Sequence, residues 1–385
     1  MSMRVLLSVP PSVLNSQPSV ERILTAEQHR VFFTSNPKGS RPGSGAGTTW
    51  LLKACYLSKQ KSTTTVIANA SVKEEGDDKK FMNYRRLPSY APFGKALAPI
   101  PVFRSSRGQS CDQTLLDVQM PLYEEVMRRA PPQLRTLVSC GDVLILLDQP
   151  LPPIPQDTDV VCYGIQKEAD VLGKHGVFFM NRDTPDELEM MLQKPSLKEV
   201  HEYASGREAV MDIGLWLLID RAVEVLRQRS IVESYLKEQS DKCGLKEYDL
   251  YIDFGMALGK RPLRDDAFIQ ELRVEIITIR DARFFHYGTT EELITSTFTI
   301  QNTLRNSDGS MQGTVSRHPA TFSQNAIIHI PLTEEKRFVW IENSEISSGW
   351  TLEHHSGITA VPRNTWKLHV PAYVCIGVVP VRRGG

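Results

Sequence analysis

Apolar residues in the first part of the chain occur in short runs separated by stretches with helical spacing. Runs typical of β-strands lie at residues 31–34, 63–67, 136–139 and 143–147. A helix is predicted over residues 113–129, where apolar side chains recur at the spacing of one helix face. Strands that alternate with helices predict an α/β fold with a mostly parallel sheet and helices on both of its faces.

The pattern in the middle of the chain, up to residue 304, is mixed. Strands are predicted at residues 160–163, 176–180 and 213–218, and a helix at residues 220–229. Residues 184–193 carry three carboxylates near their start. Because carboxylates suit the positive end of a helix dipole, we expect a helix there as well.

The last part of the chain consists of short β-type fragments with Pro, Gly or Asn between them. They lie at residues 326–330, 338–341, 350–352, 358–361, 366–370 and 373–379. Their length and spacing favour a β-solenoid, although the repeat is imperfect and a loose β-sandwich is the alternative. We therefore expect one domain over residues 1–304 and a β-solenoid region over residues 305–385.

Composition narrows the possible partners. The 385 residues include 45 Lys and Arg against 45 Asp and Glu, so the formal net charge is zero. A neutral chain has no overall attraction to nucleic acid or anionic lipid, and we expect neither as a partner. No apolar run approaches the roughly 20 residues of a membrane helix. The six cysteines form no CxxC pair, which favours free thiols and a cytoplasmic location.

A glycine-rich segment, GSGAGTT at residues 43–49, precedes a predicted helix at residues 50–57. Glycines before a helix allow backbone N–H groups to approach a phosphate, and the helix dipole favours the anion. The segment is not a Walker A loop, because no Lys-Ser/Thr pair follows at the required spacing. A flexible turn is the alternative interpretation.

A proline-rich loop holds two cationic side chains in place. Prolines at positions 88, 92, 99 and 101 predict a rigid, extended segment that carries Arg86 and Lys95. Cations at fixed positions suit the binding of a triphosphate, since they neutralise charge on phosphoryl oxygens. Otherwise the segment is a rigid surface loop with solvated basic side chains.

The motif RRLPSYAPFGKALAPIPVF resembles the nucleotidyltransferase loop of sugar-nucleotide pyrophosphorylases, in the form found in bifunctional L-fucokinase/GDP-L-fucose pyrophosphorylases. The resemblance extends over nearly the whole chain, through TSNPKGSRPGSGAGTTWLL, DQTLLDVQMPLYEEVM, SCGDVLI, DVVCYGI, MDIGLWLLIDRAVEVL and YDLYIDFGMALG. It implies a Rossmann-like nucleotidyltransferase domain followed by a solenoid of the left-handed β-helix type. The kinase half of that family would come after residue 385.

The resemblance also implies roles on the nucleotide side of the site. Residues that would line the nucleotide are Gly43, Gly45, Gly47 and Thr48. Arg86 and Lys95 would act as catalytic residues by contacting the GTP phosphates, with Lys95 stabilising the pentavalent centre at the α-phosphorus.

On the sugar side, Lys194 would contact the sugar phosphate, with Gln193 replacing the glutamate that precedes this lysine in the superfamily. Asp212 and Gly214, in the MDIG segment, stand where other members hold the sugar.

A single carboxylate is implied for the metal. Asp142 resembles the catalytic aspartate that holds Mg²⁺ in this superfamily, and a hard divalent ion suits one or two carboxylates together with substrate phosphates. His286 occupies the place of a second metal-binding aspartate, but neutral imidazole is a poor Mg²⁺ ligand, and a structural role is the simpler interpretation. Asp253 is the other candidate for the second metal contact.

One departure from the family pattern concerns the nucleotide loop. A His-Ala-Gly-Gly-x-Ser stretch usually precedes the Arg-Arg-Leu-Pro segment, but KKFMNY stands here at residues 79–84. A side chain at a position of positive φ is strained and fills space that the nucleotide needs. A rebuilt loop that uses residues 68–71, a degenerate homologue and a sequence artefact all remain open.

The expected reaction is GTP + L-fucose 1-phosphate → GDP-L-fucose + pyrophosphate. D-arabinose 1-phosphate lacks only the C6 methyl, a difference typically worth about 1–3 kcal/mol, and is expected as a second substrate. The alternative is a catalytically degenerate binding or scaffold module. A homo-oligomer or a separate kinase partner is compatible with either function.

Overall fold

The computed structural model describes residues 4–8, 30–34, 43–57, 65–69, 95–97, 99–100, 105–106, 109–110, 113–230, 247–307, 321–333 and 335–378. Within this part of the chain, no helix has the length and apolar character needed to span a membrane. The chain forms two compact units. Unit 1 comprises Met1–Lys79 and Leu115–Phe284, and unit 2 comprises Lys80–Thr114 and Phe285–Gly385. This division differs from the predicted boundary at residue 304.

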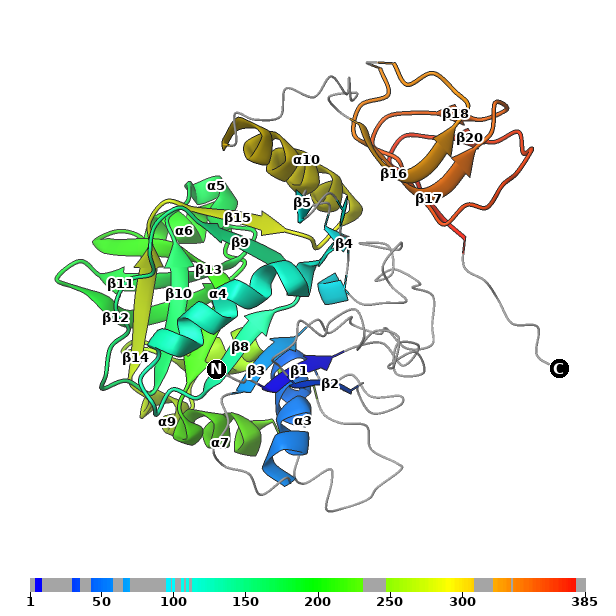
Figure 1. The fold of residues 1–385 in the computed structure, drawn as a ribbon. Coiled ribbons are helices and arrows are strands. Elements are labelled where there is room, and N and C mark those ends of the chain that lie inside the picture. Colours follow the sequence, from blue (N-terminus) through cyan, green and yellow to red (C-terminus); the bar gives the residue numbers. More distant parts are fainter. Residues whose placement is uncertain are drawn as a thin grey trace. The chain divides into compact units, whose positions relative to one another are not determined.

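Unit 1 is built on a sheet that contains nine of the described strands, in the order β10-β14-β12-β11-β13-β8-β3-β1-β2 (Figure 1). In chain order they are β1 (Arg4–Ser8), β2 (Arg30–Thr34), β3 (Thr65–Asn69), β8 (Thr136–Cys140), β10 (Val160–Ile165), β11 (Gly176–Asn181), β12 (Thr184–Gln193), β13 (Arg207–Leu218) and β14 (Val274–Ile279). The sheet combines with helices in an α/β architecture, as predicted.

The sheet is mixed rather than mostly parallel. Strands β2, β1, β3 and β8 run parallel to one another, as do β10 and β14. The long strand β13 is antiparallel to β8, β10 and β11. The antiparallel pairs come from the middle zone of the chain, where the alternation of strands and helices breaks down.

Residues 184–193 form strand β12, so the predicted helix is wrong. β12 pairs antiparallel with β11, and it buries Leu188, Met190, Met191 and Leu192. The carboxylates at its start are partly or fully exposed, and Lys260 forms an ion pair with Glu187. Cross-strand pairing and burial therefore determine the conformation of this segment more strongly than the position of its charges does.

The longer helices of unit 1 are α3 (Gly43–Leu57), α4 (Leu115–Arg129) and α7 (Asp220–Arg229). The shorter ones are α5 (Ala169–Leu172), α6 (Leu197–Tyr203), η3 (Leu250–Phe254), η4 (Gly255–Ala257) and α9 (Ala267–Gln270). The apolar face predicted for α4 is buried through Leu115, Leu116, Leu122 and Val126. Strand β9 (Val143–Leu147) completes this list, and β15 (Ala282–His286) contains the boundary between the two units at Phe284.

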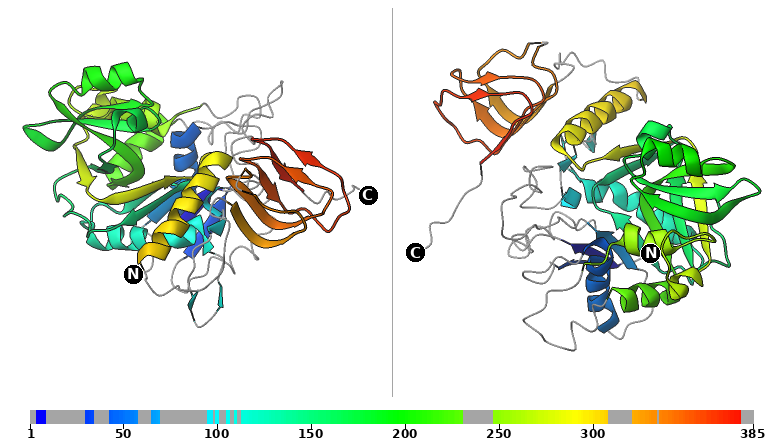
Figure 2. Two further views of the ribbon diagram at one scale, coloured as in Figure 1. Left: turned by 90° about the horizontal axis from the view of Figure 1, so that it is seen from above. Right: turned by 180° about the vertical axis from the view of Figure 1, so that it is seen from behind.

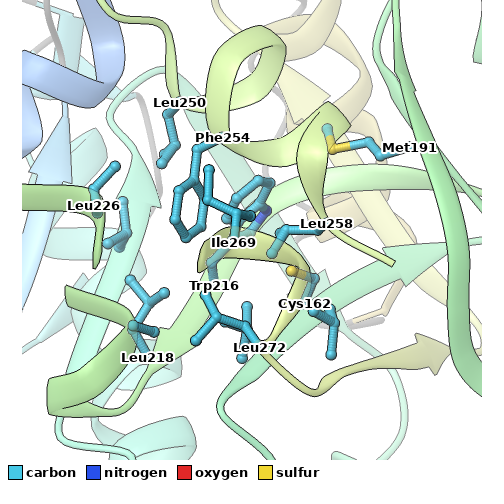
Figure 3. Packing of buried hydrophobic residues seen from close by; sticks show 14 of the residues in the cluster. Cys162, Met191, Trp216, Leu218, Leu226, Leu250, Phe254, Leu258, Ile269 and Leu272 are labelled. Atoms are coloured by element: carbon cyan, nitrogen blue, oxygen red, sulfur yellow. The ribbon is translucent and has the colours of Figure 1, made fainter. Parts of the chain in front are cut away.

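Buried side chains from distant parts of the sequence form the main core of unit 1 (Figure 3). Trp216 of β13, Leu226 of α7 and Phe254 of η3 have at most 1% of their surface exposed. Because they belong to one buried cluster, the segment that contains η3 is held beside the last residues of β13.

Unit 2 contains α10 (Thr290–Ser307) and a stack of parallel strands (Figure 2). The strands are β16 (Thr321–Ile328), β17 (Val339–Ile346), β18 (Thr351–Leu352), β19 (Gly357–Thr359), β20 (His369–Val370) and β21 (Cys375–Gly377). Short elements from residues 95–114 are η2 (Lys95–Leu97), β4 (Pro99–Ile100), β5 (Ser105–Ser106), β6 (Gln109–Ser110) and β7 (Gln113–Thr114).

The parallel strands form the predicted β-solenoid. One sheet has the order β16-β17-β19-β21, and β18 pairs with β20 in a second sheet. Equivalent positions recur 17 or 18 residues apart, and Asn325 forms a hydrogen bond with Asn343 in the next turn. Rings also follow one another from turn to turn, because Phe338 packs against His355 with tilted planes and His355 stacks on Tyr373. Parallel pairing with a repeat of 17 or 18 residues excludes the antiparallel β-sandwich.

Candidate functional site

The candidate site lies in unit 1, where β8 ends beside Gly214 of β13. β8 ends at Cys140, and the turn formed by Gly141 and Asp142 leads into β9. Asp142 is half-buried. Because a strand end fixes the start of the following turn, the position of β8 determines where the turn that carries Asp142 begins.

Asp212 and Gly214 lie on β13, beside the end of β8. Gly214 has a φ of 69° and donates its backbone N–H to Asp212 Oδ1 at 2.8 Å. The same oxygen accepts the indole N–H of Trp216 at 3.1 Å. Burial raises the pKa of Asp212 to about 7, although these two hydrogen bonds oppose the shift. The carboxyl group is therefore held in place and partly protonated near neutral pH.

The side chain of Cys140, at the end of β8, lies between Gly214 of β13 and Tyr251 of η3. A Cβ atom on Gly214 would lie 2.2 Å from Cys140 Sγ, so the thiol fills the space left by the glycine. The Tyr251 hydroxyl lies 2.7 Å from the same sulfur. Burial raises the pKa of Tyr251 well above its ordinary value, and the neighbouring Cys140 and Asp212 raise it further.

The end of β12 lies next to Asp212. Gln193 pairs with Gly176 of β11, and a Cβ on Gly176 would lie 3.1 Å from Gln193 Oε1 and 3.2 Å from Asp212 Cβ. Gln193 Oε1 is buried and has no hydrogen-bond partner among the described residues. Lys194 follows with an exposed side chain and a φ of 50°, and its N–H donates to the His175 carbonyl at 2.9 Å.

The structure thus brings four of the predicted site residues into one region of unit 1. They are Asp142, Lys194, Asp212 and Gly214. It adds Cys140, Trp216 and Tyr251, to which the sequence analysis assigned no role. All three lie in motifs that carry the family resemblance (SCGDVLI, MDIGLWL and YDLYIDFG), and this was the only available sign of their importance.

The glycine-rich segment does not form a loop before a helix. Helix α3 begins at Gly43, so all three glycines lie inside it. The N–H groups of Gly45 and Ala46 both donate to the Tyr248 carbonyl, at 2.9 and 3.1 Å. A Cβ on Gly45 would lie 2.6 Å from Tyr248 Cδ1. The glycine therefore allows residues 248–250 to approach the helix.

Thr48 also contacts the chain itself. It is buried, and its hydroxyl donates to the Ser44 carbonyl at 2.8 Å. The Ser44 hydroxyl donates to Asp249 Oδ2 at 3.0 Å and accepts the Leu250 N–H at 2.7 Å. The predicted loop conformation is wrong. The segment that packs on these residues, 248–250, lies about 200 residues away in the sequence, so the local pattern could not indicate it. The nucleotide contacts of Gly43, Gly45, Gly47 and Thr48 stay a prediction.

The described residues of unit 1 include neither of the two predicted cationic residues. Arg86 lies outside the described residues, as do residues 79–84, where the glycines of the family pattern are missing. Lys95 begins the short helix η2 in unit 2. Their contacts with phosphate stay predictions.

The residues present fit a Mg²⁺ site with one protein carboxylate. Within the described ranges, no group of three or more His, Cys, Asp or Glu side chains is arranged to hold a metal ion. Mg²⁺ usually takes most of its ligands from water and substrate phosphates, so Asp142 alone meets this requirement.

Neither candidate for a second metal ligand is supported. Asp253 forms an ion pair with Arg264 at 2.9 Å and accepts the Asp249 N–H at 2.7 Å. His286 Nδ1 lies 3.0 Å from Glu292 Oε1 in unit 2, in agreement with the structural role considered for this histidine.

Comparison with known proteins identifies relatives of the whole chain. A family profile described as the fucose pyrophosphorylase domain matches residues 83–275. The L-fucokinase/L-fucose-1-P guanylyltransferase of Bacteroides fragilis is 44% identical over 384 residues, which cover 98% of this chain and 39% of that protein. The chain therefore spans about two fifths of the length of this curated relative.

Two solved structures show more distant similarity. UDP-glucose pyrophosphorylase complexed with UDP-glucose matches with 10% identity and a TM-score of 0.35, over 78% of this chain and 81% of its own. Mannose-1-phosphate geranyltransferase from Thermus thermophilus matches with 12% identity and a TM-score of 0.33, over 98% of this chain and 92% of its own.

Proposed function

Because this chain belongs to the fucose pyrophosphorylase family, we propose that it is a sugar-1-phosphate nucleotidyltransferase that makes GDP-L-fucose and pyrophosphate from GTP and L-fucose 1-phosphate. The observation that carries the proposal is the 44% identity, over 98% of the chain, to a protein described as an L-fucose-1-P guanylyltransferase. The site in unit 1 supports it with a carboxylate for a divalent ion and a second carboxyl group on β13.

In the proposed reaction, a phosphate oxygen of the sugar phosphate attacks the α-phosphorus of GTP in line. A new P–O bond forms there while the bond from the α-phosphorus to the bridging oxygen breaks, and pyrophosphate leaves with that oxygen. The nucleophile is already an anion, so no general base is needed. Positioning and charge neutralisation supply most of the rate acceleration.

The chain's own residues divide this work between two sides of the site. Asp142 would hold Mg²⁺ on the phosphate side, and the bound ion supplies neutralisation of charge on the phosphoryl oxygens. Arg86 and Lys95 would add positive charge to the triphosphate. On the sugar side, Lys194 would bind the sugar phosphate, and Asp212 and Gly214 would hold the sugar.

The direct test is pyrophosphate release by the purified protein with GTP, Mg²⁺ and L-fucose 1-phosphate. ATP and UTP replace GTP in parallel reactions, and D-arabinose 1-phosphate replaces the fucose derivative. We expect release that requires both GTP and the sugar phosphate and that the Lys95→Ala and Asp142→Ala substitutions abolish. Release with D-arabinose 1-phosphate is expected at about 10- to 200-fold lower efficiency, because one methyl group is worth about 1–3 kcal/mol.

The altered nucleotide loop motivates a second candidate function, a binding or scaffold module. KKFMNY at residues 79–84 stands where the family has two glycines. Such a module would show no release with any nucleotide while remaining folded. If instead UTP or ATP supports faster release than GTP, the proposed base specificity is wrong.

A further inference from the structure

The end of β8, from which the Asp142 turn departs, is paired with β13 only as far as Ser139. The antiparallel register runs from Leu218 opposite Thr136 to Leu215 opposite Ser139. The next residue on β13, Gly214, has a φ of 69° and takes the chain out of the extended conformation. On its other side, Cys140 still pairs with Asn69 of β3. At its last residue, β8 is therefore supported by a strand ladder on one side only.

Side chains replace the ladder on the other side. Cys140 Sγ occupies the space beside Gly214, where any Cβ would lie 2.2 Å from the sulfur. The Tyr251 hydroxyl lies 2.7 Å from this sulfur, and either atom has a hydrogen to donate. The thiol is thus held between the glycine backbone and the phenol, two residues before Asp142.

Tyr251 is itself held from two directions. Its backbone N–H donates to Asp249 Oδ1 at 2.9 Å, within the N-terminal turn of η3. Its ring packs edge-on against Trp216, with centroids 5.7 Å apart and planes at 82°. The Trp216 indole donates in turn to Asp212. A continuous set of contacts therefore runs from Asp212 on the proposed sugar side to Cys140 on the proposed phosphate side.

We propose that Tyr251 is a positioning residue which, by holding the Cys140 thiol, fixes the Asp142 turn in the orientation needed to hold the divalent ion of a bound metal–nucleotide. This inference rests on the proposed function, because that function supplies the metal–nucleotide. Tyr251 contacts neither substrate nor metal in this role and acts through Cys140 alone.

The test compares the binding of Mn²⁺·GTP and of metal-free GTP by calorimetry, in wild type and in Tyr251→Phe. This substitution keeps the ring against Trp216 and removes only the hydroxyl. Substitution of a residue that supports a metal ligand typically lowers metal affinity about 10- to 100-fold. We expect the affinity for Mn²⁺·GTP to fall by about tenfold and that for metal-free GTP to change by less than about twofold.

Three further variants separate positioning from a general effect on folding. Cys140→Ser keeps a hydrogen-bonding group and should stay close to wild type, whereas Cys140→Ala should behave like Tyr251→Phe. Tyr163→Phe is the matched control, since the Tyr163 hydroxyl is buried without a hydrogen-bond partner among the described residues. It should leave both affinities unchanged.

The proposal is overturned if Tyr251→Phe and Cys140→Ala lower the affinities for Mn²⁺·GTP and for metal-free GTP equally, or if they lower neither affinity. It is also overturned if the wild type itself binds Mn²⁺·GTP no more tightly than metal-free GTP. Pyrophosphate release reports separately on the proposed function. A wild type that prefers Mn²⁺·GTP but releases no pyrophosphate with L-fucose 1-phosphate overturns that function, while the affinity ratio of the variants still decides the role of Tyr251.

Discussion

The indole N–H of Trp216 donates to Asp212 Oδ1 at 3.1 Å, four residues away on the same strand. In a regular strand these two side chains would point to the same face of the sheet, but they would be separated along the strand by two of its two-residue repeats. The left-handed conformation of Gly214, between them, accompanies their close approach. The carboxyl group of Asp212 is buried in the site, so its ionisation makes the stability of the protein depend on pH near neutrality.

The first prediction concerns stability against pH. Burial raises the pKa of Asp212 from 3.8 to about 7, so the folded protein keeps a proton that the unfolded chain releases between these values. The resulting stabilisation is fully present below about pH 4 and is lost as the pH rises through about 7. From about pH 5.5 to about pH 8, the free energy of unfolding should fall by about 2 kcal/mol through this group.

Urea unfolding of wild type and Asp212→Asn at these two pH values measures the effect. The amide is neutral and keeps an oxygen for Gly214 and Trp216, so the variant should lose less stability with rising pH than wild type. Asp157→Asn, at an exposed position, is the control and should follow wild type. Parallel profiles for wild type and Asp212→Asn would show that the carboxyl group is ionised throughout this range.

The second prediction distinguishes packing from nucleotide binding at Gly45. In Gly45→Ala the new methyl would lie 2.6 Å from Tyr248 Cδ1 and 3.0 Å from the Tyr248 carbonyl oxygen. Overpacking of this kind typically costs about 1–3 kcal/mol, and we expect a loss of stability in that range. If Gly45 serves packing alone, GTP affinity, measured well below the unfolding transition, should change by less than about twofold. A stable variant that no longer binds GTP would instead place Gly45 against the nucleotide.

The third prediction concerns the solenoid. Asn325 and Asn343 both have a φ of 47°, and Asn325 Nδ2 donates to Asn343 Oδ1 at 2.7 Å. Asn343→Ala loses the hydrogen bond and strains the left-handed backbone by about 1–2 kcal/mol, whereas Asn343→Gly loses only the hydrogen bond. Hydrogen exchange in β17 should therefore be faster in the alanine variant than in the glycine variant.

Ser323, exposed on β16 and paired with Ile341, provides the control. In an extended strand, glycine is less favourable than alanine, so Ser323→Gly should exchange faster than Ser323→Ala. If glycine is also the worse substitution at position 343, the left-handed conformation does not determine the stability of this turn.

Sequence periodicity was sufficient where local contacts decide the structure. The helix predicted from residue 113 is present as α4, and the short C-terminal fragments form the solenoid, because a repeat of 17 or 18 residues places each fragment on the next. The same reasoning failed at residues 184–193, which form β12. There the neighbours β11 and β14 determine the conformation, and β14 lies about 90 residues further along the chain.

The candidate site shows the same division. Asp142, Lys194, Asp212 and Gly214 were assigned by resemblance to a family, and the structure brings them into one region of unit 1. The contact between Cys140 and Tyr251 joins residues 111 positions apart. No local pattern carries information about such a pair, because a thiol beside a phenol follows from how η3 packs on β13 and not from either segment alone.

The last prediction tests the fit between Gly214 and Cys140. In Gly214→Ala the methyl group would lie 2.2 Å from Cys140 Sγ and 2.9 Å from its Cβ, at a φ of 69°. Gly206→Ala isolates the backbone term, since Gly206 has a φ of 76° and a Cβ there would have nothing within 4 Å. Strain alone costs about 1–2 kcal/mol, so Gly214→Ala should lower the free energy of unfolding by clearly more than Gly206→Ala.

Adding Cys140→Ala to Gly214→Ala removes the closest atom and leaves the strain and the contact with Cβ. The double variant should therefore regain part of the lost stability, even though Cys140→Ala alone is destabilising through the loss of its contact with Tyr251. Chemical unfolding of the wild type, the two single variants and the double variant measures this coupling, which for residues in contact is typically about 0.5–3 kcal/mol. Additive effects would mean that the thiol does not occupy the space beside Gly214, and the support for the Asp142 turn would have to come from elsewhere in unit 1.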